Sequence, residues 1–222
     1  MSLVLIPQYR VARRSAAAPP AFSFLQATAD TTDTTTYTFA SQNLGAAASD
    51  RRIIVCVHTR WGAGTPTLTS VTVGGVTATI SVNNSILTGG TQGNRAAIAI
   101  AEVPTGTAGN IVVTFSSTMV RCQIGVYRAT GIATAASSTG SDVTATLSVT
   151  LTAPTDGFVI AAYSDSPPAT ATWSGGVSGD YSALVETHFR VQAASAYLSG
   201  SVTIGTGVSA GTGVLVVASW GA

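Results

Sequence analysis

Residues 70–80 read SVTVGGVTATI, and this stretch predicts a β-hairpin. Val71 and Val73 alternate with threonine before the two glycines, and apolar residues alternate with threonine after them, as in two strands that each bury one face. The pair Gly74-Gly75 supplies the positive φ angles that a two-residue hairpin turn requires. Because a tight turn joins antiparallel strands, the stretch favours a fold made of antiparallel sheets.

The rest of the chain follows the same style. Short β-branched runs alternate with Gly, Pro, Asn and Asp, and no stretch has convincing helical periodicity. The expected strands cover residues 34–40, 52–59, 68–73, 76–82, 96–103, 111–115, 121–128, 143–152, 157–163, 183–191, 196–204 and 213–220. About a dozen strands without crossover helices predict antiparallel sheets rather than an α/β fold.

Continuous apolar runs indicate how these strands pack. Residues 53–57, 98–101 and 214–217 are apolar without interruption, as in strands that are central in a sandwich. We therefore expect an all-β, antiparallel, two-sheet β-sandwich. A jelly-roll-like arrangement is favoured because about twelve strands exceed the immunoglobulin count, and an immunoglobulin-like sandwich is the alternative. Residues 22–222 are expected to form one domain, without an internal repeat of fixed period.

Residues 1–21 are expected to form an extended N-terminal arm. Four large aliphatic residues stop at Pro7, arginines follow them, and the spacer AAAPPA of residues 16–21 leads into the folded part. A signal peptide places its positive charge before an apolar run of about 7 to 15 residues, and a transmembrane helix needs about 20 apolar residues. A frayed chain end is the remaining alternative.

We expect this arm to dock on another subunit. Main-chain pairing with a strand edge and charge-assisted hydrogen bonds from the arginines would add to the burial of the aliphatic side chains. The expected partner-binding residues are Leu3, Val4, Leu5, Ile6, Tyr9, Arg10, Arg13 and Arg14.

The composition favours an assembled protein. Charged residues make up 9% of the chain, against about 25% in an average soluble domain. The ten positive residues are all arginines, and the net charge is +1. A surface with so little charge favours association. The sequence lacks the basic stripe that would predict a nucleic-acid partner. We expect neither a nucleic-acid nor a membrane partner, and a homo-oligomer is expected.

Candidate catalytic residues fail on their context. The sequence GVSAG around Ser209 matches a nucleophile elbow, but a glycine-rich turn leads into another strand instead of a helix. Strand alternation places Cys56, His58 and Arg60 on one face, where neighbours two residues apart are about 6.5 to 7 Å from one another. That separation is too long for a nucleophile and its base without a bend. We expect no catalytic residue and no cofactor.

The cysteines and aspartates are expected to have structural roles. Cys56 and Cys122 are expected to be buried free thiols, although a bridge stays open if their strands face each other. Asp30 with Asp33, or Asp165 near Asp180, is too sparse for the six to eight oxygens of a calcium site. We expect no metal, and turn-forming hydrogen bonds from Asp30, Asp156 and Asp165.

Aromatic residues leave two alternatives open. Trp61, Trp173, Tyr181 and Phe189 are expected to be exposed enough to cover the core as lids, and a sugar-stacking platform is the alternative use of such rings. Trp61, Trp173 and Tyr181 are the candidates for facing a bound glycan.

Four segments carry a resemblance to a known group. The segments VTVGGVTATI, AEVPTGTAGNIVVTF, MVRCQIGVYRATG and APTDGFVIAAYS resemble, in order and character, β-rich virion structural proteins of tailed bacteriophages, over roughly residues 34–220. The arm is outside this resemblance. The resemblance implies a virion protein assembled in the bacterial cytoplasm, with the major capsid protein or tail subunits as partners.

The resemblance and the composition together lead to one expected function. We expect a non-enzymatic head decoration or cement protein. The alternatives are a tail-tip, spike or fibre module that binds host glycans, and a polysaccharide-acting enzyme.

Overall fold

The computed structural model describes residues 19–166, 169–208 and 211–222. In this part of the chain there are sixteen strands and no helix, so none that is long and apolar enough to cross a membrane. The strands are β1 (Ala21–Asp30), β2 (Thr34–Asn43), β3 (Arg52–Trp61), β4 (Leu68–Val73), β5 (Val76–Thr77), β6 (Thr79–Gly89), β7 (Gln92–Glu102), β8 (Ala108–Met119), β9 (Arg121–Thr130), β10 (Ser138–Asp142), β11 (Ser148–Ala153), β12 (Phe158–Asp165), β13 (Ser178–Glu186), β14 (Phe189–Tyr197), β15 (Gly200–Gly205) and β16 (Val214–Trp220).

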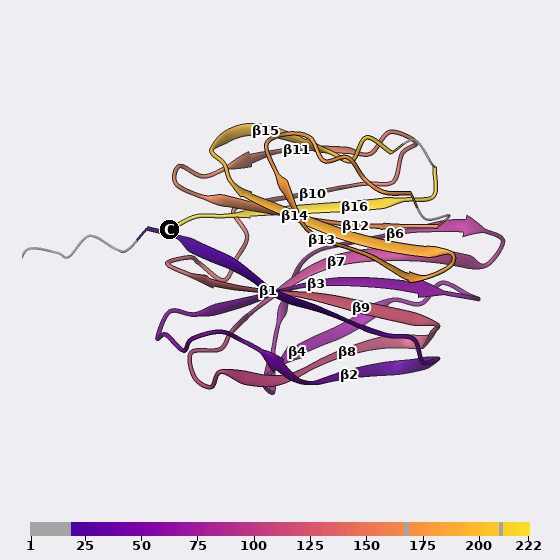
Figure 1. Cartoon of the computed structure of the whole chain (residues 1–222), viewed down its shortest axis with the longest axis horizontal. Coiled ribbons are helices and arrows are strands. Elements are labelled where there is room, and N and C mark those ends of the chain that lie inside the picture. Colours follow the sequence, from indigo (N-terminus) through magenta and orange to yellow (C-terminus); the bar gives the residue numbers. More distant parts are fainter. Residues whose placement is uncertain (1–18, 167–168, 209–210) are drawn as a thin grey trace, which may run out of the picture.

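The strands form four antiparallel sheets that are stacked as layers (Figure 1). Sheet A has the order β1-β9-β3-β7-β6, and sheet B has the order β2-β8-β4-β5. Sheet C has the order β10-β16-β12-β14-β13, and sheet D consists of β11 and β15. The layers follow one another as B, A, C and D, with β2 and β15 in the outermost layers (Figure 1). The predicted all-β antiparallel sandwich is confirmed, with four sheets where two were expected.

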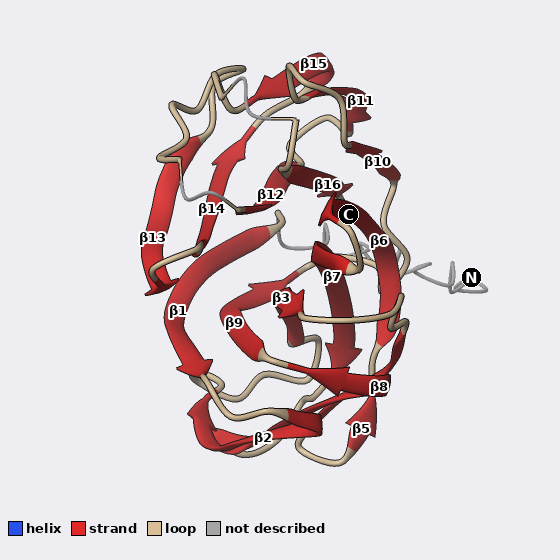
Figure 2. Cartoon of the chain, turned by 90° about the vertical axis from the view of Figure 1, so that its right-hand side faces the viewer, coloured by secondary structure: helices blue, strands red, loops and turns tan. Residues whose placement is uncertain are grey.

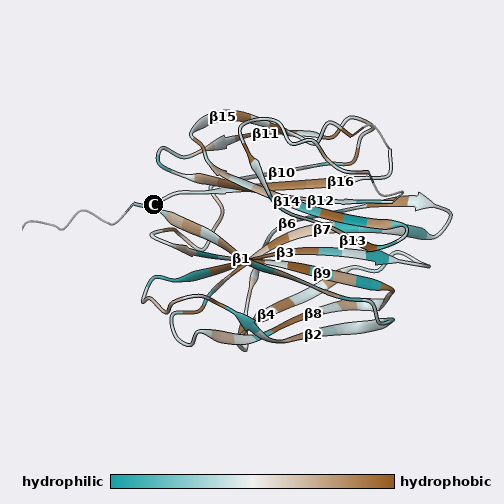
Figure 3. Cartoon of the chain, viewed as in Figure 1, coloured by the Kyte–Doolittle hydropathy of each residue, from teal (hydrophilic) through white to brown (hydrophobic). Residues whose placement is uncertain are grey.

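Three apolar cores lie between the four layers. Ile53, Val55 and Val57 of β3 belong to the core between sheets A and B, whereas Ile54 and Cys56 point to the core between sheets A and C. A third core fills the space between sheets C and D. Sheets A and C are thus covered on both faces, which explains their continuous apolar runs. Strands β3, β9 and β16 are accordingly among the strongly apolar strands in Figure 3.

The predicted hairpin is present, although its second strand is short. Gly74 and Gly75 have φ angles of 57° and 84°, and Val73 pairs with Val76. The expected strand 76–82 is divided at Ala78, which is buried beneath sheet B. After it the chain leaves sheet B and continues as β6 at the edge of sheet A (Figure 2).

Other strand boundaries differ because polar residues make turns inside apolar patterns. The expected strand 143–152 starts late, since Asp142 ends β10 and its carboxylate accepts the N–H groups of Thr144 and Ser148. The expected strands 183–191 and 196–204 each contain a turn between two strands. Strand β1 was missed, and it is paired along its length with β9.

The predicted absence of a repeat of fixed period concerns the sequence, but the strand topology does repeat. Sheet C repeats the strand order of sheet A when β10, β12, β13, β14 and β16 are matched with β1, β3, β6, β7 and β9. The pair β11-β15 then matches the pair β2-β8. The repeat was invisible in the sequence because the same burial pattern is met by different apolar residues at different spacings.

Candidate functional site

Several buried polar side chains lie between sheets A and C. His58 of β3 is fully buried there, and its Nδ1 lies 3.0 Å from Oγ of Ser164 on β12. Its Nε2 lies 2.6 Å from the hydroxyl oxygen of Tyr181 on β13. The Ser164 hydroxyl donates to the carbonyl oxygen of Arg95 at 3.0 Å. These bonds connect strands that belong to two different sheets.

The direction of this chain of hydrogen bonds follows from its fixed end. Because the Ser164 hydroxyl donates to a carbonyl, its oxygen accepts the proton on Nδ1 of His58. Nε2 is then the acceptor, and the Tyr181 hydroxyl donates to it. Burial disfavours the charged ring and lowers the pKa of His58 to about 3. His58 is therefore a neutral connector between the two sheets at ordinary pH.

A second polar group lies in the same interface. The Tyr127 hydroxyl and the Ser195 hydroxyl donate to Oδ2 of Asp180, at 2.7 and 2.6 Å. Tyr127 belongs to β9 of sheet A, and the other two residues belong to sheet C. Burial raises the pKa of Asp180, while the two hydroxyl donors act in the opposite direction. This carboxylate also joins the two sheets.

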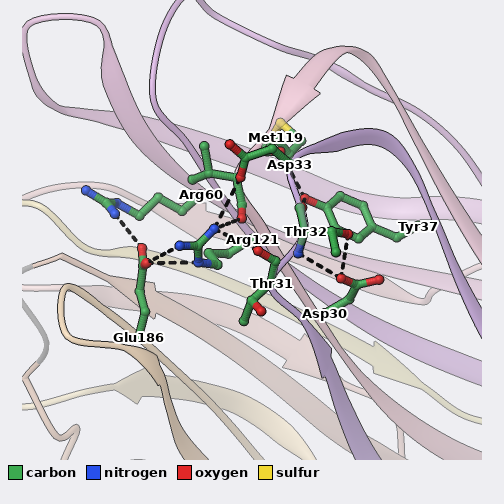
Figure 4. Close-up of polar contacts among 10 residues, drawn as sticks. Asp30, Thr31, Thr32, Asp33, Tyr37, Arg60, Met119, Arg121 and Glu186 are labelled. Atoms are coloured by element: carbon green, nitrogen blue, oxygen red, sulfur yellow. Dashed lines mark hydrogen bonds and ion pairs between the residues drawn. The ribbon is translucent and has the colours of Figure 1, made fainter.

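An ion-pair cluster also joins sheets A and C (Figure 4). Glu186 of β13 accepts from Arg60 of β3 and from Arg121 of β9, the latter at 2.8 Å through Nε. Arg121 also lies 3.3 Å from Asp33 and donates to the carbonyl of Thr31 at 2.9 Å. The side chain of Glu186 is 21% exposed, so this bidentate cluster is shielded in part from solvent. The cluster links sheet C with strands β3 and β9 of sheet A and with the turn after β1.

An open depression of about 410 Å³ adjoins this cluster. It is lined from sheet A by Arg60, Thr88 and Gln92, and from the other side by Ser166 and His188. Arg60 is already engaged there, because its second terminal nitrogen donates to Gln92 at 2.9 Å. The lining offers hydrogen-bonding groups to a polar ligand.

The predicted faces of β3 are confirmed, and they separate the two cysteines. Cys56 and His58 point to the interface with sheet C, while Cys122 belongs to the core between sheets A and B. Both thiols are free and buried, and burial raises the pKa of each. A disulfide between them is excluded by their location on opposite faces of one sheet. Ser209 lies outside the described residues.

The prediction that four aromatic side chains are exposed is wrong, because all four are buried or partly buried. Trp61 is 2% exposed, and its indole N–H donates to the carbonyl of Gly64 at 2.9 Å. Phe189 is fully buried. Trp173 and Tyr181 are partly buried and pack against different cores, Trp173 between sheets C and D and Tyr181 between sheets A and C. The candidate glycan-facing residues thus do not share a surface.

The aspartates form turns or internal contacts. Asp30 accepts the N–H of Thr32 at 2.9 Å, as expected, and Asp156 occupies a turn with a φ of 55°. Asp165 is fully buried and accepts from Ser166, Ala169 and Thr212. Within the described ranges, no three His, Cys, Asp or Glu residues are grouped so that they could hold a metal ion.

Sequence reasoning missed several buried polar residues. Arg51 is fully buried, and its guanidinium donates to the carbonyls of Leu44, Gly45, Val103 and Thr105, which joins the loops before β3 and after β7. Asp180 and Ser164 were also not recognised as interface residues. The only signal in the sequence was their position within strand patterns, and their partners lie more than ten residues away along the chain.

The predicted arm residues, from Leu3 to Arg14, lie outside the described residues. Comparisons with models of protein families, with curated proteins and with solved structures give no match to this chain.

Proposed function

We propose that the protein is a non-enzymatic structural subunit of a tailed-bacteriophage virion, and that it decorates the capsid by docking its N-terminal arm on the shell. The observation that carries the proposal is the use of reactive side chains as internal ties. His58, Asp180 and Glu186 each join sheet A to sheet C. Such a body is suited to bearing load, and its sparsely charged composition suits contact with neighbouring subunits.

The position at which the arm leaves the body supports this proposal. Strand β1 begins at the end of the molecule where the chain also ends (Figure 1). Phe22 packs against Phe158 with tilted rings whose centroids are 4.5 Å apart, and its N–H donates to the Tyr197 hydroxyl at 3.1 Å. The residues after the arm are thereby fixed to sheet C. An arm that docks on a capsid protein would therefore attach the folded domain to the shell through β1 and sheet C.

A tail-tip, spike or fibre module that binds host glycans is the second candidate. One observation favours it: Tyr197 is 56% exposed and lines an open depression of about 400 Å³ together with Asp156 and Ser199. An aromatic face beside a carboxylate and a hydroxyl suits a sugar ring. Loss of glycan binding in Tyr197→Ala, with an unchanged circular dichroism spectrum, would support this candidate.

The copy number in purified particles distinguishes the two. A decoration protein is expected in hundreds of copies per particle, whereas a tail component is expected in a few to some tens. Quantitative mass spectrometry against the major capsid protein measures this ratio. Absence of the protein from purified particles would contradict both candidates.

A further inference from the structure

The repeated strand order extends to matching irregularities. In β6 the register against β7 shifts between Ile80 and Val82, and in β13 the register against β14 shifts between Gly179 and Tyr181. The shifts lie opposite Ala99 and Ala194, which are therefore equivalent positions. A β-bulge is a local feature that strand order alone does not require. Its recurrence indicates two versions of one structural unit.

The equivalence of Ala99 and Ala194 also aligns the central strands β3 and β12, through the residues that pair with these two alanines. Ala99 is opposite Val55, and Ala194 is opposite Ala161, so His58 of β3 corresponds to Ser164 of β12. The burial pattern agrees with the alignment. The residues of β3 that face sheet B correspond to those of β12 that face sheet D, and these are Ile53, Val55 and Val57 in β3, and Val159, Ala161 and Tyr163 in β12.

A glycine pair also recurs before the matching edge strands. Gly74 and Gly75 precede β6, and Gly175 and Gly176 precede β13. All four have positive φ angles, of 57°, 84°, 82° and 87°. Ser174, just before the second pair, bridges to Gly205 at the end of β15, as β4 pairs with β8 in the first half. The second unit is thus a shortened form of the first.

The two units face each other as the halves of a two-fold dimer do. Strand β1 contacts β13, and β6 contacts β10 (Figure 2). Because β1 is equivalent to β10 and β6 to β13, these two contacts are the same contact with the two units exchanged. In the same way, β3 contacts β14 and β7 contacts β12. The equivalent residues His58 and Ser164 are hydrogen-bonded to one another, as expected for residues on a two-fold axis.

From this geometry we infer that residues 21–130 and 138–220 are two copies of one folding unit, fused in a single chain. The interface between sheets A and C is then a docking surface between two partners of the same kind, and the polypeptide link is not needed to hold it. Each unit has a core of its own, between sheets A and B and between sheets C and D. The interface adds the third core and the polar ties described above.

A cleavable full-length chain tests this inference. The segment between β9 and β10 contains exposed Ala135, so a protease recognition sequence can be inserted after it. After complete cleavage, the two fragments should elute together at the volume of the intact chain and keep its circular dichroism spectrum. Separation of the fragments, or loss of the β-sheet signal, would overturn the inference.

A charge in the interface provides the matched comparison. Ala162 of β12 is fully buried in the core between sheets A and C, and Thr152 of β11 is exposed. After cleavage, Ala162→Glu should release the fragments from one another, whereas Thr152→Glu should leave them associated. Full association of cleaved Ala162→Glu would contradict the inference. So would loss of the β-sheet signal in uncleaved Ala162→Glu, because the two units would then share one indivisible core.

Discussion

His58 makes the stability of the protein depend on pH. Its pKa of about 3 in the fold lies below the ordinary value near 6.5, because burial disfavours the charged ring. The unfolded chain therefore takes up this proton first as the pH falls. The contribution of His58 is complete above about pH 6.5 and is lost between 6.5 and 3, at about 1.4 kcal/mol per pH unit.

Replacing this residue removes the dependence. His58→Gln should flatten the loss of unfolding free energy in that window, as measured by urea denaturation from pH 7 to pH 4. Asp180 acts with the opposite sign, since its raised pKa makes the fold take up a proton more readily than the unfolded chain. Asp180 remains in the variant, so it does not obscure the comparison. An unchanged pH profile would mean that His58 is not neutral in the fold.

Gly93 of β7 is required by a close approach. A Cβ atom at this position would collide with the ring of Trp61 and with the carbonyl oxygen of Ile86. Gly93→Ala should therefore lower the unfolding free energy by about 1–3 kcal/mol, as overpacked sites do. Gly62→Ala is the control, because its Cβ would make an ordinary contact of 3.5 Å with Val120. Equal melting temperatures of the two variants would contradict this packing.

The orientation of a single side chain was predictable where it depends only on the alternation of the strand that carries it. The alternation in VCVHTRW places Cys56 and His58 on one face of β3, and the structure confirms it. The burial of Trp61 was not predictable, since Arg95 and the loop at Gly64, which surround its ring, are placed by the tertiary fold. The same holds for Ser164 and Tyr181, which reach His58 from another sheet.

The hairpin between β4 and β5 depends on backbone conformation rather than on space. No atom lies within 4 Å of a Cβ built on Gly75, yet its φ is 84°. Gly75→Val should therefore be destabilising through the positive φ alone, by about 1–2 kcal/mol. Gly75→Asn should cost less, because asparagine tolerates this conformation. Equal thermal unfolding of both variants would contradict the tight turn.

Strands were predictable in proportion to their apolar content. The runs in β3, β7 and β16 are buried on both faces, and their patterns predicted all three strands, although β7 starts four residues before the expected position 96. Strand β1 was missed because it mixes aromatic, polar and small residues, and it is stabilised by pairing with β9. The turns after Asp142 and at His188 were missed because apolar residues on both sides conceal them.

The stacking of four sheets was beyond sequence reasoning. A strand pattern states which residues are buried but not which sheet covers them, so the cores on the two faces of sheet A look alike in sequence. The two-fold relation between the halves depends on bulges and pairing registers, which are set by the partners of each strand. All-β class and antiparallel pairing needed only composition and turn signals.

We propose that this protein acts by being assembled, through residues 2–20. Deleting these residues leaves β1 and all three cores in place, so the truncated protein should fold with the same cooperative melt. The decisive measurement is its copy number, relative to the full-length chain, in particles purified after both are produced together. We expect the truncated chain to be absent from particles while the full-length chain is incorporated. Incorporation of the two in equal amounts would contradict it.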